Sequence, residues 1–244
     1  MNLKFAAWFV VLATHGILAG DCWASAPIKV DVALAAFGSI QDDFQISSDG
    51  NWVVYRADRN TDEMYELYCV ASNGGTPIKL NGTLVGGGDV DSWQFSPDGS
   101  RAIYWADQQH DKLTEVYVVP TAGGASLKLN SPLVDVGSTG GAIVGDRVAY
   151  IASERTNVFF EPYFELFSAP SAGGAVERLS GEMVAGADVL SAIARAGSSR
   201  VVYLADQEVL SYQPAYQKSA SSRQPFRPYP WRYGRDQTTP PASG

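Results

Sequence analysis

The chain has 244 residues and carries 18 Lys and Arg against 26 Asp and Glu, a formal net charge of −8. A surface with this charge repels phosphate groups, so we expect no nucleic-acid partner. Two cysteines, Cys22 and Cys69, are too few for a small fold held together by several disulfides.

Residues 1–26 are predicted to be a signal peptide. Residues 1–4 carry one positive charge, and residues 5–18 are apolar apart from three positions. Small residues follow, and Gly20, Ala24 and Ala26 are the candidate cleavage sites. This pattern predicts a secreted protein that resides in the periplasm or outside the cell.

Two other interpretations of this segment rank lower. A retained membrane anchor would need about 20 apolar residues to span a bilayer, and the run is shorter. Lipidation at Cys22 is disfavoured because Asp21 separates that cysteine from the small residue before it. We therefore expect no stable membrane span once the signal is removed.

Residues 44–210 repeat one pattern three times in full and a fourth time in part. Each full copy has a turn, a strand of β-branched and aromatic residues, a second strand that begins with Glu, and a Gly-Gly turn. The turn positions are Asp49, Gly50, Asp98 and Gly99 for the first turn, and Gly74, Gly75, Gly123, Gly124, Gly173 and Gly174 for the second. Repeats of this kind stack, because one unit cannot bury its apolar face alone.

Within one copy the pattern predicts four short antiparallel strands. In the second copy, residues 93–95 alternate apolar and polar side chains, and 101–106 form a largely buried run. Residues 114–119 and 125–129 follow, separated by the Gly-Gly turn. No segment after residue 30 has the period and caps of an amphipathic helix, so the predicted class is all-β.

The repeats resemble those of TolB-like β-propellers, with related WD-like blades and the propellers of prolyl oligopeptidases. The resemblance rests on the Ser96 to Gly99 turn, the Tyr104 to Asp107 strand end, the Glu115 to Tyr117 strand and the Gly-Gly turns, and it covers about Phe44 to Asp206. It implies four-stranded blades around a central channel. It does not imply one function, because this blade occurs in binding proteins and in peptidases.

The resemblance implies an incomplete propeller. Rings close with four to eight blades, and this chain offers about three and a half. Residues 27–43 form a lead-in, in which Ile28 to Val32 could add a ring-closing strand to the last blade. Without closure the blades form an open or truncated ring, which could self-associate through its exposed blade edges.

Candidate catalytic residues are scarce. His110 is the only histidine after the signal, and it lies in a polar loop. No Gly-x-Ser-x-Gly segment presents a nucleophile, and Cys69 falls at a strand position that predicts a buried free thiol. We therefore predict a protein that is not an enzyme and has no cofactor.

Asp89, Asp91 and Asp188 are the candidate binding residues. They lie in the connections that lead into the innermost strand of a blade, which open toward the channel in propellers. The sequence pairs Asp89 and Asp91 with Ile40 and Asp42 in the first copy, Ser138 and Gly140 in the third, and Asp188 and Leu190 in the fourth. Calcium needs six to eight oxygens, so a polar channel mouth is favoured over a metal site.

Residues 211–244 have a different composition. They contain five of the basic residues and one acidic residue, with repeated prolines, which predicts an extended or disordered tail. The tail could dock on the acidic propeller or on an anionic surface. Alternatively, it arises from a shifted reading frame, since it begins where another hairpin is expected.

The favoured function is a secreted, non-catalytic propeller that binds a protein or peptide. One alternative is the detached, substrate-gating propeller of a prolyl oligopeptidase-type hydrolase. Another is a truncated gene product without function.

Overall fold

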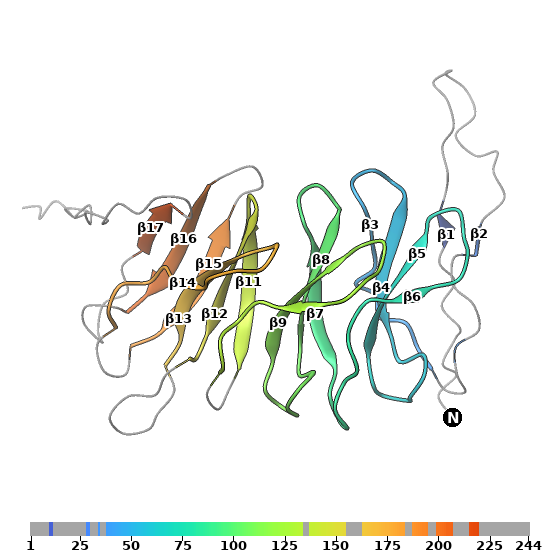
Figure 1. Ribbon diagram of the computed structural model, residues 1–244, viewed down its shortest axis with the longest axis horizontal. Helices are drawn as coiled ribbons and strands as arrows, with labels where there is room; N and C mark the ends of the chain where they lie inside the picture. The colour runs from blue at the N-terminus through green and yellow to red at the C-terminus, as the bar shows by residue number, and fades with distance from the viewer. Residues whose placement is uncertain are drawn as a thin grey trace, which may run out of the picture.

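The computed structural model describes most of the repeat region. The described residues are 34, 38–133, 137–154, 163–183, 187–194 and 199–206, together with the strand backbones of 10–11, 28–29 and 215–219. Every regular element in this part of the chain is a β-strand (Figure 1). None of the described residues form a helix that is long and apolar enough to cross a membrane.

Four antiparallel sheets follow one another along the chain, and we call them blades one to four. Blade one contains β3 (Gln45–Ile46), β4 (Trp52–Ala57), β5 (Glu66–Ala71) and β6 (Ile78–Lys79). Blade two contains β7 (Val90–Phe95), β8 (Arg101–Ala106), β9 (Glu115–Pro120) and β10 (Leu127–Lys128). Blade three contains β11 (Ser138–Val144), β12 (Arg147–Ala152), β13 (Glu165–Pro170) and β14 (Glu177–Arg178).

Blade four has three strands, β15 (Val189–Ala194), β16 (Arg200–Ala205) and β17 (Ala215–Ser219). The sequence predicts no strand after residue 206, because residues 215–219 lack the alternation of a half-buried strand. The backbone of β17 nevertheless pairs with β16 over five residues, which supplies hydrogen bonds to an otherwise open edge. The tail region 211–244 thus contributes one strand to the propeller.

Two residues of the lead-in form a described strand. β2 (Ile28–Lys29) pairs with β1 (Val10–Val11). Residues 30–32 of the proposed ring-closing strand lie outside the described residues. β1 falls within the predicted signal peptide, and the rest of that segment lies outside the described residues.

Consecutive blades stack through buried side chains. We call the side of a blade that contacts the following blade its forward face, and the opposite side its rear face. At each seam, apolar residues of a forward face pack against a row on the next rear face in which a tyrosine lies between two smaller residues. The rows are Ala102, Tyr104 and Ala106 in blade two, Val148, Tyr150 and Ala152 in blade three, and Val201, Tyr203 and Ala205 in blade four.

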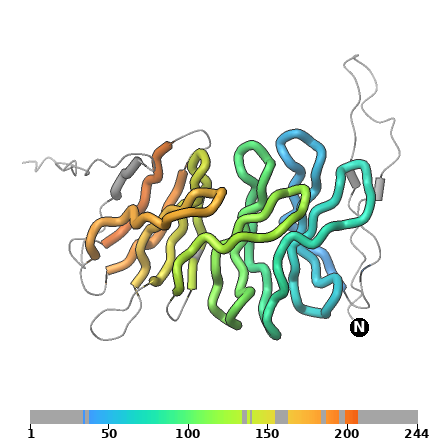
Figure 2. Tube along the Cα trace, in the orientation of Figure 1, coloured from blue at the N-terminus to red at the C-terminus, as the bar shows by residue number. Residues whose placement is uncertain are grey.

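The stack forms an open arc. Blade one and blade four lie at opposite ends of the long axis of the molecule (Figure 1). The tube in Figure 2 passes from the first blade to the last without returning to the start. The predicted all-β fold of antiparallel blades in an open ring is confirmed.

Candidate binding surface at the connector edge

Two kinds of loop from the blades lie along one edge of the arc. The loops between the second and third strands, 58–65 and 107–114, lie there together with the connectors into the next blade, such as 82–89. We call this the connector edge. All three candidate binding residues of the sequence lie on it.

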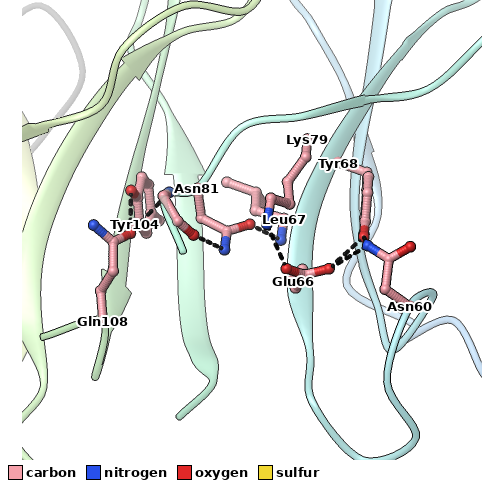
Figure 3. Close-up of polar contacts among 9 residues, drawn as sticks. Asn60, Glu66, Leu67, Tyr68, Lys79, Asn81, Tyr104 and Gln108 are labelled. Carbon is pink, nitrogen blue, oxygen red and sulfur yellow. Dashed lines mark hydrogen bonds and ion pairs between the residues drawn. The ribbon is translucent and has the colours of Figure 1, made fainter. Parts of the chain in front are cut away.

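A buried carboxylate begins the third strand of each of the first three blades. In blade one, Glu66 Oε2 accepts hydrogen bonds from Asn60 Nδ2 at 2.8 Å and Tyr68 OH at 2.5 Å, and Oε1 pairs with Lys79 Nζ at 2.7 Å (Figure 3). Burial raises the pKa of Glu66, but these three donors outweigh it and hold the pKa below its usual value. The carboxylate therefore stabilises the fold at neutral pH, and this contribution is lost as the pH falls through the lowered pKa.

A second polar side chain anchors each connector. Asn81 Oδ1 accepts from Leu67 N at 2.8 Å, and Asn81 Nδ2 donates to Gly82 O at 2.8 Å. Gln108 of the following blade then accepts from Gly82 N at 2.9 Å and from Tyr104 OH at 3.0 Å (Figure 3). The start of the connector is thereby tied to both blades of the seam.

Blade three places Glu154 where blade two has Gln108. Glu154 Oε1 accepts from Ser131 N at 3.3 Å and from Tyr150 OH at 3.4 Å. Burial, and also the charge of Glu165, raise the pKa of Glu154 despite these hydrogen bonds. An acid whose pKa is raised in the folded state costs stability once the pH exceeds that pKa.

Glu154→Gln is therefore expected to stabilise the protein at pH 7, by on the order of 1 kcal/mol. The glutamine oxygen can still accept from both donors, as Gln108 does in blade two. The gain should vanish as the pH falls toward about 4, where the glutamate is protonated. Urea melts at both pH values measure this, with Gln108→Glu as the mirror variant that should destabilise at pH 7. A loss of stability for Glu154→Gln at pH 7 would contradict the account.

Aspartates at the end of the second strand hold the connector edge together. Asp107 Oδ1 accepts from Asp89 N at 2.5 Å, and Asp107 Oδ2 accepts from Lys112 N at 3.1 Å. Asp58 makes the same two kinds of contact, with Ser39 N and with Glu63 N. In blade four Asp206 accepts from Asp188 N at 2.5 Å. These side chains cap the following loop and fix the entry of the first strand.

Two of the candidate residues, Asp89 and Asp188, join adjacent blades. Asp89 Oδ1 accepts from Tyr65 N of blade one at 2.6 Å, and Asp188 Oδ1 accepts from Phe164 N of blade three at 2.7 Å. The two carboxylates occupy equivalent seams that are two blades apart. Each is occupied by a backbone donor, which gives it a structural role.

The strand register corrects which residues of the other copies are equivalent to Asp89 and Asp91. Val90 lies opposite Ala106, Ile40 opposite Ala57, and Ser138 opposite Ala152. Asp89 is therefore equivalent to Ser39 and Gly137, and Asp91 to Gln41 and Thr139. Each of these equivalent residues lies one position earlier in the chain than the sequence comparison of the copies predicts. The connector has no landmark that fixes this register, whereas the strand pairs do. At Gly137 an added Cβ would lie 2.5 Å from Thr114 N, so the third blade has no room for a side chain there.

Asp91 differs from the other two candidates, because it is exposed. Its Oδ2 accepts from Thr114 Oγ1 at 2.8 Å. Arg56 of blade one reaches the same place, where its guanidinium donates to Val90 O at 2.8 Å and Asp91 O at 2.5 Å. The Nε of Arg56 pairs with Asp43 at 2.7 Å.

Sequence reasoning missed Arg56. The equivalent positions hold Trp105, Ile151 and Leu204, so a charged residue at this point of the repeat was the available signal. Arg56 thereby links β4 to the first strand of blade two.

Partial burial raises the pKa of Asp89 and that of Asp91, more than any other cause. Asp107 raises both further, and Arg56 lowers both. Hydrogen bonds from Tyr65 and Thr114 oppose the rise at Asp89 and Asp91 respectively. Several carboxylates and one arginine therefore lie close together on the connector edge at the seam of blades one and two.

The two residues considered for catalysis, Cys69 and His110, lie in different environments. Cys69 is a buried free thiol, as predicted, and burial raises its pKa to about 12. His110 is exposed in the loop 107–114. Within the described ranges, no three His, Cys, Asp or Glu side chains are grouped to hold a metal ion.

The turn residues lie on the opposite edge of the arc. Asp98 accepts from Ser96 Oγ at 2.6 Å and from Ser100 Oγ at 2.8 Å, and these bonds lower its pKa to about 2. Asp49 makes the same contact with Ser47 at 2.5 Å. All eight glycines of the predicted turns have positive φ, from 71° at Gly99 to 140° at Gly124.

No protein-family model matches this chain, and no curated protein sequence matches it. Solved structures do. A protein described as a TolB from Agrobacterium tumefaciens is 20% identical with a TM-score of 0.51, and the match covers 82% of this chain and 67% of that one.

Two peptidases share the same architecture over a smaller part of their length. A prolyl endopeptidase is 14% identical with a TM-score of 0.52, covering 77% of this chain and 26% of the peptidase. The tricorn protease is 14% identical with a TM-score of 0.51, covering 66% and 15%. The chain thus spans about a quarter or less of either peptidase. Identities this low show the fold alone, and that fold is a β-propeller.

Proposed function

We propose that this chain is an exported, non-catalytic propeller module that binds a basic segment of a protein or peptide at its connector edge. The observation that carries the proposal is Asp91, an exposed carboxylate at the seam of blades one and two. Thr114 Oγ1 is the only described side-chain donor that it has, which leaves Oδ1 available to a ligand.

The surroundings of Asp91 favour a cationic ligand. Arg56 is already committed to Asp43 and to two backbone carbonyls, so it does not neutralise the surface fully. Asp62 and Glu63 are exposed on the neighbouring loop of blade one. Charges arranged in this way attract a partner of opposite sign and set its orientation.

Binding is tested with a synthetic Lys- and Arg-rich peptide and a twin in which the basic residues are glutamate. We expect only the basic peptide to bind, and Asp91→Asn to weaken it about fivefold, which corresponds to about 1 kcal/mol. Asp146→Asn is the matched control, because Asp146 is exposed in a turn on the opposite edge. Equal binding of both peptides, or an unchanged affinity of Asp91→Asn, would refute the proposed ligand.

Export is tested separately by cell fractionation and N-terminal sequencing. The expected N-terminus lies between Asp21 and Pro27, on a protein found outside the cytoplasm. A cytoplasmic protein that begins at Met1 would contradict the export signal.

The similarity to the two peptidases supports a second candidate function. In that account the chain is a propeller that gates access to a hydrolase domain on another chain. An α/β-hydrolase reading frame directly downstream, and peptidase activity that changes when the two proteins are mixed, would favour it. Envelope-transport genes at that place would favour the binding module.

A further inference from the structure

Blade four lies at one end of the arc and exposes large apolar side chains there (Figure 1). Leu190, Ile193 and Val202 are 48%, 68% and 36% exposed. Val202 is equivalent to Val54 and Ile103, which are fully buried because the next blade covers them. Ile193 lies directly opposite Val202 in the sheet, so both side chains belong to the forward face. Within the described residues, no following blade covers this face.

Two other exposed apolar residues lie within the stack. Ile78 and Leu127 lie over the Gly-Gly turn of the following blade, where a Cβ on Gly123 would come within 3.1 Å of Ile78 and one on Gly173 within 2.5 Å of Leu127. These two side chains therefore already have a place in the seams.

Blade one needs no additional cover. Phe44 and Ile46 are half exposed there, but the rear-face residues Val53, Tyr55 and Ala57 are at most 2% exposed. They are as buried as the rows inside the seams. The unexplained apolar surface is therefore on blade four.

Two of the exposed residues of blade four depart from the repeat. The strand register shows that the equivalent positions in the other blades hold polar or small residues. The equivalents of Ile193 are Gln45, Gln94 and Ala142. The equivalents of Leu190 are Gln41, Asp91 and Thr139. Since the internal seams form without apolar side chains at these two places, the cover of blade four differs from a further blade.

The exposed apolar surface of blade four is small. Stable contacts between folded subunits bury about 800 Å² on each partner, from about 20 to 30 residues. Three partly exposed side chains fall short of this, so a second copy or another folded partner is a poor occupant. A short segment with large apolar side chains fits the area better.

The chain itself leaves blade four beside this surface. β17 is the outer strand in the order β15-β16-β17, and it ends at Ser219, which is paired with Arg200. β15 lies two strand spacings away, about 10 Å. Residues 220–225 could span up to about 20 Å when extended, so the segment after them can reach Ile193. The rear face packs on blade three, which leaves the forward face available.

Residues 226–233 have the composition that this surface requires. They contain four aromatic residues, Phe226, Tyr229, Trp231 and Tyr233. Aromatic side chains bury a large area at a low cost in conformational entropy. The prolines among them lack a backbone N–H, so the segment is a poor continuation of the sheet edge and contacts it through side chains instead. Residues 220–244 also carry four arginines and one aspartate, which favours contact with a chain whose net charge is −8.

We propose that residues 226–233 fold back on the forward face of blade four and cover Leu190, Ile193 and Val202. The short connection to Ser219 keeps the segment at a high local concentration, so a contact that would be weak between separate molecules forms within the chain. The segment covers one part of the face and does not replace a blade. This inference does not depend on the ligand proposed for Asp91.

Trypsin cleavage of the full chain, expressed with its own export signal, tests the contact at the bond after Arg232. We expect cleavage at least about tenfold slower than in a free peptide of residues 220–244. Leu190→Asp combined with Ile193→Gln gives blade four the residues of blade two at these positions, and should raise the rate to that of the peptide. Both side chains are exposed, so this variant should keep native circular dichroism. Gln94→Glu, at the place of Ile193 in blade two, is the matched control and should leave the rate unchanged.

Two results of this experiment contradict the proposal. The first is a native chain in which the bond after Arg232 is cleaved as fast as in the free peptide. The second is a double variant that is cleaved as slowly as the native chain.

A disulfide trap determines where the segment lies and to which copy it belongs. Ser191→Cys with Arg232→Cys leaves every proposed contact in place, and in a Cys22→Ser background it should form an intramolecular disulfide on oxidation. Ser92→Cys with Arg232→Cys is the matched control, because Ser92 is the exposed equivalent of Ser191 in blade two, and should form none. Cys69 is buried and takes no part. A disulfide-linked dimer would assign the surface to a second copy, and equal trapping at both serines would show no preferred place. Either result would overturn the proposal.

Discussion

Replacing Tyr104 by alanine is expected to lower the free energy of unfolding by about 3 to 5 kcal/mol. Tyr104 is fully buried in the seam of blades one and two, and its ring stacks on Tyr117 with centroids 5.1 Å apart. Its hydroxyl donates to Gln108 Oε1, so the substitution also removes one anchor of the connector. Denaturant melts followed by circular dichroism measure the loss.

Tyr203→Ala is the matched comparison and should cost less. Tyr203 has the same place in blade four, but it is 5% exposed and its blade has a neighbour on one side only. Stability in a stacked array depends on nearest-neighbour interfaces, so blade four can unfold while the others remain folded. Equal losses for the two variants would show that blade four is covered within a single chain.

Lys128→Met is expected to destabilise the protein by about 3 kcal/mol, the second large effect. Glu115 is 1% exposed and forms an ion pair with Lys128 and a hydrogen bond with Tyr117 OH. Removing the lysine leaves a buried carboxylate without its counter-charge, which costs far more than losing a surface pair. Urea unfolding at pH 7 provides the measurement.

Lys112→Met is the control for this prediction. Lys112 lies 4.0 Å from Asp111 with its side chain 89% exposed, so the pair is screened by solvent. Its loss should change the free energy of unfolding by less than about 0.5 kcal/mol. Similar effects for both lysines would mean that the Glu115 pair is not buried as described.

Much of the fold follows from repetition in the sequence. The strand ending in Asp107, the strand beginning with Glu115 and the turn at Gly123 recur at a nearly fixed spacing, and each landmark has a local physical role. Asp107 caps a loop, Glu115 begins a strand and Gly123 has φ of 93°. Each of these local roles can be recognised in one copy of the repeat, and the same landmarks recur in the other copies. The blade could therefore be predicted from the sequence.

The sequence was less informative wherever a contact crosses a seam. Asp89 was predicted to line the channel mouth, and its carboxylate also accepts a backbone hydrogen bond from Tyr65 of the preceding blade, of which the sequence shows no sign. No pattern within one copy reveals such a partner. Arg56 was missed for the same reason, since its acceptors at Val90 and Asp91 belong to the next blade.

The pairing of β17 was also beyond the sequence. Residues 215–219 have no apolar alternation, and their strand exists because β16 offers a free edge. The composition of a segment predicts what it can bury, and an open edge can order a segment through its backbone alone. The Pro-rich remainder of the tail lies outside the described residues.

The open arc is tested most directly by a distance between its two ends. Spin labels on Ile46→Cys and Val202→Cys, diluted with unlabelled protein, report the separation within one chain by pulsed electron resonance. Cys69 should stay unlabelled, because it is buried and its thiol pKa is raised to about 12. We predict a separation far longer than that of a reference pair on adjacent blades, Ile46→Cys with Gln94→Cys. A separation as short as the reference would show a four-bladed ring closed within one chain and would contradict the account.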